Sequence, residues 1–291
     1  MSVTRVLTAL HDLALRPLTG NVKLLAAPNP GIPDLKMPLT PLPTGLPASA
    51  YDGLFIGGDN RVYPRGTPFE AVPPMLPAQG VTNGELILHT NGIGESVLGD
   101  AARMSMLADA TGSRVVGICN ASDGFPKDVL QTLRDRADKG KNPAVDTVTE
   151  LIAAHAKPGM PGLTFSGHSQ GSLIVSRAFA DVRNRLTLEG GMSQSEADRA
   201  LGKFKLLTIA GAASHYDDAV RTLHLVDRAD VVQLFSLFAF GNNPPNRLVH
   251  QGNNSRTVAF NTWNPVKAHD VETNLGHLPK DWLKYLENTP A

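Results

Sequence analysis

The pentapeptide Gly167-His168-Ser169-Gln170-Gly171 has the residue types and spacing of a nucleophilic site. An apolar run over 162–166 precedes it and a helix-like stretch over 172–180 follows it, which predicts a strand, a sharp turn and a helix. The two glycines let strand and helix approach closely. Such a turn strains Ser169 and lifts its hydroxyl above the sheet edge, where the helix N-terminus favours developing negative charge. The chemistry predicted is acyl transfer.

An acyl-transfer serine needs a base, a group that orients the base, and donors for the oxyanion. In its strand–turn–helix context this Gly-His-Ser-Gln-Gly motif resembles the nucleophile elbow of the α/β-hydrolase superfamily. The resemblance implies an acid just after the second-last strand and a histidine just after the last one. It also implies a backbone N–H donor from the residue that follows the serine, here Gln170.

Two aspartates follow the expected strand over 221–226, Asp227 and Asp230. Asp230, followed by Val231, resembles the pattern of bacterial lipase-like hydrolases and is the preferred acid. Asp227, at the strand end, is the alternative acid or a turn-former. Asp217 and Asp218, after the preceding strand, are a third choice.

Two histidines follow the last expected strand, His269 and His277. His269 is the preferred base, since a loop directly after the strand can place it over the elbow. His277 is the alternative, although Pro279 at the start of a closing helix is expected to hold it away. Structural roles are expected for the other seven histidines: His11, His89, His155, His168, His215, His224 and His250.

The second oxyanion donor is expected from the loop over 89–95, where Gly92 and Ile93 are the candidates. The sequence Asn91-Gly92-Ile93, together with residues 119–124, resembles a group of bacterial lipase-like hydrolases. Some members of that group are effectors directed against bacteria or host cells.

Apolar runs alternate with helical patterns from residue 85 onward, which predicts a mostly parallel buried sheet. We expect an α/β-hydrolase fold with helices on both faces of the sheet. A β-hairpin is expected where Tyr51–Ile56 and Arg61–Tyr63 flank a Gly-Gly-Asp-Asn turn. The expected strands are 85–89, 114–119, 162–166, 204–210, 221–226 and 256–262, and the expected helices are 96–111, 126–137, 143–152, 172–180, 194–203 and 279–287.

The N-terminal part differs in composition from the rest. A short amphipathic helix is expected over 3–14, and prolines recur from residue 28 onward. We therefore predict an N-terminal helix and Pro-rich extension over 1–48 and a hydrolase domain over 49–291. No classical signal peptide is expected, which leaves a cytoplasmic protein or one exported by another route, such as a secreted effector.

Charge and composition limit the partners. The 27 basic and 27 acidic residues balance, which gives no reason to expect nucleic acid. Cys119 is the single cysteine, so no intrachain disulfide can form. No cluster has metal-ligand spacing, and neither a metal nor a cofactor is expected. The apolar segment over 231–240 follows Asp230 and is interpreted as an acyl-binding wall or as a buried helix.

These patterns predict a serine hydrolase that cleaves lipid or other acyl esters through Ser169, His269 and Asp230. A lipase, a phospholipase, an esterase, a thioesterase and a peptidase all stay open, and a lipid substrate would bring transient contact with a membrane surface. The alternative is a non-catalytic binding or effector module that keeps the elbow only as structure.

Overall fold

The computed structural model describes residues 51–92, 97–120, 142–230, 252–264 and 267–287, which lie within one unit, 40–291. Five predicted features therefore fall outside the described residues: the N-terminal helix, the Pro-rich extension to residue 48, Ile93, the helix over 126–137 and the apolar segment over 231–240.

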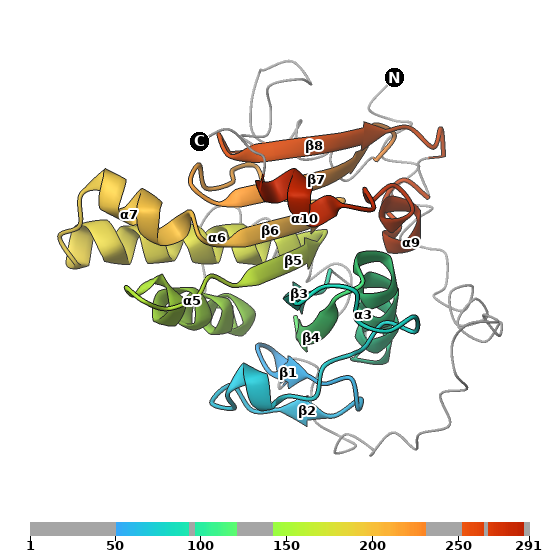
Figure 1. The fold of residues 1–291 in the computed structure, drawn as a ribbon, viewed down its shortest axis with the longest axis horizontal. Helices are drawn as coiled ribbons and strands as arrows, with labels where there is room; N and C mark the ends of the chain where they lie inside the picture. Colours follow the sequence, from blue (N-terminus) through green and yellow to red (C-terminus); the bar gives the residue numbers. More distant parts are fainter. Residues whose placement is uncertain (1–50, 93–96, 121–141, 231–251, 265–266, 288–291) are drawn as a thin grey trace. The chain divides into compact units, whose positions relative to one another are not determined.

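The described residues form an α/β fold around an eight-stranded sheet with the order β2-β1-β4-β3-β5-β6-β7-β8 (Figure 1). β3 to β8 run parallel, whereas β1 pairs antiparallel with both β2 and β4. The strands are β1 (Phe55–Ile56), β2 (Val62–Tyr63), β3 (Leu86–Thr90), β4 (Arg114–Ile118), β5 (Thr164–His168), β6 (Lys205–Ile209), β7 (Arg221–Asp227) and β8 (Ser255–Phe260).

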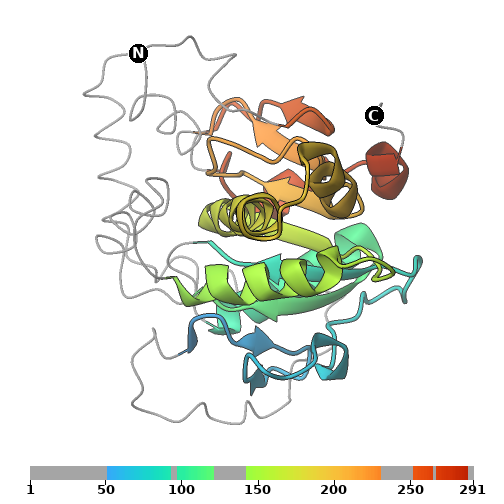
Figure 2. The same ribbon diagram turned by 90° about the vertical axis from the view of Figure 1, so that its left-hand side faces the viewer.

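Helices cover both faces of the sheet, and Figure 2 shows α5 and α6 on one side and α10 on the other. Successive strand residues point to opposite faces of the sheet. Leu88 therefore packs on the face covered by α5 and α6, and Ile87 packs on the face covered by α10. Strands buried on both faces need apolar side chains throughout, which explains their continuous hydrophobic runs. The helices of the first face are α5 (Pro143–Ala156), α6 (Gln170–Asn184) and α7 (Gln194–Leu201), and those of the second are α3 (Val97–Thr111), α9 (Val271–Leu275) and α10 (Trp282–Glu287).

The predicted elements among the described residues are present, with shifted ends. The hairpin pairs only two residues on each strand, on either side of a turn at Gly58 and Asp59. Helix α7 begins with a capping box, in which Ser193 Oγ accepts from the Glu196 N–H. Three short elements were not predicted: the 3₁₀ turn η2 (Phe69–Ala71), the π-helical turn η3 (Arg185–Glu189) and α9, which Asp270 caps through the Thr273 N–H.

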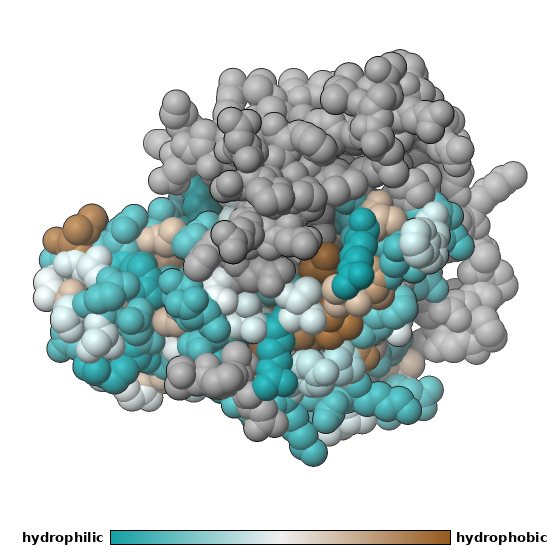
Figure 3. Space-filling view, turned by 90° about the horizontal axis from the view of Figure 1, so that it is seen from above, coloured by the Kyte–Doolittle hydropathy of each residue, from teal (hydrophilic) through white to brown (hydrophobic). Residues whose placement is uncertain are grey.

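The surface visible in Figure 3 is mostly hydrophilic where residues are described, with separate hydrophobic areas. Large apolar side chains that are exposed include Leu188 and Trp263, at 80% and 86% of their maximum. None of the helices within the described ranges is long and apolar enough to cross a membrane.

Candidate active site

Ser169 lies at the turn between β5 and α6, in a strained backbone conformation. Its φ of 52° and ψ of −119° lie outside the regions that residues with a side chain favour, at a cost of about 1–3 kcal/mol. The glycines around it are required by close contact. A Cβ on Gly167 would lie 2.5 Å from the Ser172 backbone, and one on Gly171 would lie 2.0 Å from the Thr90 carbonyl oxygen. The predicted close approach of strand and helix is confirmed by these distances.

Hydrogen bonds around the turn hold this strained conformation. The Ser169 N–H donates to the Ile209 carbonyl at 3.0 Å. The Ser169 carbonyl accepts from the Ser172 hydroxyl at 2.7 Å and from the N–H groups of Ser172 and Ala212 at 3.2 and 3.1 Å. The strain at Ser169 is therefore offset by bonds to the first turn of α6 and to the loop after β6.

Ser169, His269 and Asp230 lie in one hydrogen-bonded line. His269 Nε2 is 2.8 Å from Ser169 Oγ, and His269 Nδ1 is 2.8 Å from Asp230 Oδ2. A carboxylate can only accept, so Nδ1–H donates to Asp230 and Nε2 accepts from the serine hydroxyl. The three residues follow β5, β8 and β7, whose carboxyl ends lie at one edge because these strands are parallel (Figure 1).

The side chains of Asp230 and His269 differ in their exposure to solvent. The Asp230 side chain is fully buried, whereas the His269 ring is 20% exposed. A buried carboxylate beside a partly exposed imidazole stabilises the imidazolium that forms when the ring takes a proton. The arrangement can activate a hydroxyl for attack on an electrophile that approaches from solvent.

The alternative residues lie elsewhere. Asp227 is buried and accepts from the Ala229 and Thr262 N–H groups, so it ties the loop after β7 to the loop after β8. His277 is exposed and stacks on Phe260 with ring centroids 3.9 Å apart. Asp217 forms a bidentate ion pair with Arg183.

Three consecutive backbone carbonyls of the His269 loop each accept a side-chain hydrogen bond. Asn274 Nδ2 donates to the Ala268 carbonyl at 3.0 Å and to the Asp270 carbonyl at 2.8 Å. His168 Nε2 lies 3.1 Å from the His269 carbonyl oxygen, and because a carbonyl only accepts, this nitrogen carries the proton. The loop that holds His269 is thus fixed from α9 and from the residue before Ser169.

The loop after β3 contacts the Ser169 turn directly. A Cβ on Gly92 would lie 2.9 Å from His168 Nδ1 and 3.1 Å from Ser169 Cβ, so a glycine is needed there. Gln170 begins α6 and is buried. Its side-chain Oε1 accepts from Asn120 Nδ2 at 2.9 Å. The candidate oxyanion donors Gln170 and Gly92 therefore lie on segments that flank Ser169.

Sequence reasoning did not single out the side chains of Asn120 and Asn274, and it gave His168 a general structural role. His168 and His269 are 101 positions apart, and Asn120 and Gln170 are 50 apart. Patterns within a short stretch of sequence cannot predict contacts between residues this far apart. The one sequence signal was position: Asn120 is the second residue after β4, at the same sheet edge as Ser169.

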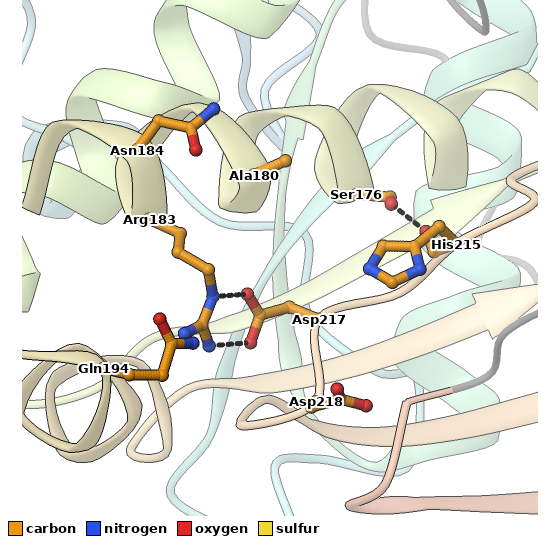
Figure 4. Close-up of a pocket in the computed structure, with 8 residues that line it drawn as sticks. All are labelled: Ser176, Ala180, Arg183, Asn184, Gln194, His215, Asp217 and Asp218. Atoms are coloured by element: carbon orange, nitrogen blue, oxygen red, sulfur yellow. Dashed lines mark hydrogen bonds and ion pairs between the residues drawn. The ribbon is translucent and has the colours of Figure 1, made fainter. Parts of the chain in front are cut away.

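A separate polar pocket of about 170 Å³ lies along the second half of α6 (Figure 4). Ser176 donates to the His215 carbonyl there, and the Arg183 guanidinium bonds to Asp217 and Asp198. The lining includes none of Ser169, Asp230 and His269. These ion pairs join α6 to α7 and to the loop after β6, which is a structural role.

Within the described ranges no group of three or more His, Cys, Asp or Glu side chains is placed to hold a metal ion. No family model matches the sequence, and no curated protein matches it. Among solved structures an arylesterase is similar at a TM-score of 0.39 and 12% identity, over 72% of this chain and 78% of the arylesterase chain.

Proposed function

We propose that this protein is a serine hydrolase of the α/β-hydrolase fold that cleaves carboxylic esters through an acyl-enzyme. The observation that carries the proposal is the contact of His269 with both Ser169 and Asp230, each at 2.8 Å. Both distances fall within the range that proton transfer by a general base requires, about 2.6–3.2 Å. The order Ser, Asp, His along the chain also agrees with the proposal.

The proposed reaction has two steps. Ser169 Oγ forms a bond to the ester carbonyl carbon while His269 Nε2 takes the hydroxyl proton. The oxyanion that forms accepts hydrogen bonds from the Gln170 N–H and from the loop after β3, where Gly92 and Ile93 are the candidates. Collapse breaks the bond to the alcohol, which leaves with the proton from His269. A water molecule, activated by the same imidazole, then releases the acid.

A non-catalytic module is less favoured by the same geometry. Such a module would retain the glycines of the turn, because strand and helix need them to pack. It would have no need for a buried carboxylate aligned through an imidazole with a strained serine. The alignment therefore favours catalysis over binding alone.

The substrate class we propose is an ester with an apolar acyl chain. It rests on the sequence alone, because the apolar segment over 231–240 directly follows Asp230. A series of p-nitrophenyl esters from acetate to palmitate tests the class, with a phospholipid, a thioester and a peptide as further arms. A preference for the acetate ester would contradict the proposal that the substrate has a long apolar acyl chain.

A fluorophosphonate probe tests the hydrolase itself. We expect the wild-type chain to be labelled and Ser169→Ala to be unlabelled and inactive, with an unchanged circular dichroism spectrum. Full turnover by a folded Ser169→Ala variant would reject the proposed mechanism.

A further inference from the structure

Three buried amide side chains join the segments that flank Ser169. Asn91 follows β3, Asn120 follows β4 and Gln170 follows Ser169, with exposures of 1%, 2% and 3%. Burial of an amide is unfavourable unless its donors and acceptors are bonded. A buried network of this kind fixes its members in one arrangement when its bonds are made.

Asn91 and Asn120 bond to each other through side chain and backbone. The Asn120 N–H donates to Asn91 Oδ1 at 2.6 Å, and Asn91 Nδ2 donates to the Asn120 carbonyl at 2.9 Å. Asn91 Nδ2 also lies 3.2 Å from the carbonyl oxygen of Gly92. The pair therefore sets the direction of the backbone as it leaves β3.

Asn120 also reaches the other side of Ser169. Its Nδ2 donates to Gln170 Oε1 at 2.9 Å, while its backbone holds Asn91. The start of α6 and the segment after β3 are closely packed, since a Cβ on Gly171 would lie 2.7 Å from the Asn91 carbonyl oxygen. Movement at Asn120 is thus transmitted to both segments that flank the serine.

We propose that Asn120 is a positioning residue for the oxyanion hole, acting through the Gln170 side chain and through Asn91 and Gly92. This rests on the proposed hydrolase function. Asn120 sets the first donor, the Gln170 N–H, relative to the loop that supplies the second. Donors stabilise an oxyanion only when they are already directed at the position it will occupy.

Two variants of similar volume separate the parts of this network. Gln170→Met removes Oε1 and keeps the backbone N–H, whereas Asn120→Leu removes the Nδ2 donor and keeps the backbone bond to Asn91. We expect each to slow fluorophosphonate labelling and to lower kcat on a soluble ester by about 10- to 100-fold, with KM little changed. The double variant should be no slower than Asn120→Leu alone, because both variants break the Asn120–Gln170 bond, and Asn120→Leu alone also loses the 3.5 Å bond from Nδ2 to the Asn91 carbonyl.

Asn142→Ala is the matched control. Asn142 is another buried asparagine, and it caps α5 by accepting from the Ala144 and Val145 N–H groups. Its loss should lower the melting temperature and leave the labelling rate of the folded protein unchanged.

The outcomes are distinct. A wild-type chain that is neither labelled nor active would overturn the proposed function and this proposal together. If the wild type is labelled and both Gln170→Met and Asn120→Leu keep the wild-type rate, this proposal alone is overturned. A rise in KM with unchanged kcat would also overturn it, because that pattern reports substrate binding. If Asn120→Leu does not fold, Gln170→Met decides.

Discussion

His168 bonds through its side chain to the backbone of His269, with Nε2 3.1 Å from the carbonyl oxygen. The two ring centroids are 5.2 Å apart. His168 is the last residue of β5 and directly precedes Ser169, so one contact links the candidate nucleophile's strand to the candidate base's loop. This bond holds the loop after β8 next to the turn that carries Ser169.

This contact predicts a positioning role for His168. His168→Leu should lower kcat by about tenfold, because one of three consecutive carbonyls in the His269 loop loses its side-chain bond and the imidazole is held less closely. His168→Gln should restore most of the rate, since the Gln Nε2 can donate from nearly the same place. Steady-state kinetics with a soluble ester measure both. Equal rates for Leu and wild type would show that the contact does not position the base.

Asn274 holds the same loop from α9, and here the prediction concerns stability. Asn274 is fully buried and donates to two carbonyls, at 3.0 and 2.8 Å. Asn274→Ala should lower the free energy of unfolding by about 1–3 kcal/mol, because the buried Ala268 carbonyl loses its side-chain donor while the Asp270 carbonyl keeps only the bond from the residue 274 N–H. Urea denaturation measures the difference. A loss below about 0.5 kcal/mol would mean that water replaces both bonds.

The sequence predicted the parts of this site that depend on local pattern. The strand, turn and helix around Ser169 follow from apolar residues and two glycines in a short window. The glycines are explained by the space available, since an added Cβ would lie only 2.5 or 2.0 Å from neighbouring backbone atoms. The regions that carry Asp230 and His269 were chosen because the resemblance to the α/β-hydrolases implies an acid and a histidine after the last two strands, and parallel strands bring these carboxyl ends to one edge. Their catalytic roles stay predictions.

The supporting side chains could not be predicted in this way. The bonds of Asn120 to Gln170 and of His168 to His269 join residues far apart in sequence, and asparagine and histidine occur equally well in loops and caps. Helix α9 was missed because it has only five residues, too few for an apolar period to show. Its one signal was Asp270 ahead of Thr273, a typical N-cap pair.

Substitution of Asp230 and of Asp227 is predicted to have different effects, on activity in the first case and on stability in the second. Asp230→Asn should lower kcat/KM on the order of 10³- to 10⁴-fold, because an amide no longer stabilises the imidazolium and can hold the wrong tautomer. Asp227→Asn should keep most of the activity and lower the free energy of unfolding by about 1–3 kcal/mol, since Asp227 accepts from Thr262 and Ala229. Kinetics and urea denaturation of both variants give the ranking. A reversed ranking in kinetics would assign the acid to Asp227.

Cys119 is predicted to be unreactive in the folded protein. Burial raises the pKa of its thiol, and the negative charges of Asp100 and Asp52 raise it further. A raised pKa lowers the thiolate fraction at pH 8, and the thiolate is the nucleophile. Reaction with a disulfide reagent such as DTNB should therefore be more than about tenfold slower in the native protein than in guanidinium. Fast native labelling would contradict this burial, and Cys119→Ser should retain hydrolysis.

The last prediction separates the two histidines after β8. His269 contacts Ser169 and Asp230, whereas His277 is exposed and stacks on Phe260. His269→Ala should abolish ester hydrolysis, because His269 Nε2 lies 2.8 Å from the Ser169 hydroxyl and is the group proposed to take its proton.

His277→Ala is the matched control for this test. It should keep most of the activity, since stacking on Phe260 at the sheet edge affects packing and not proton transfer. Both variants are compared by kcat/KM on a soluble ester and by the rate of fluorophosphonate labelling, with melting temperatures to check folding. The loop of His269 has its carbonyls held by Asn274 and His168, so the backbone should survive loss of the ring. A folded His269→Ala variant that keeps hydrolysis while His277→Ala loses it would assign the base to His277 and would leave the nucleophile at Ser169.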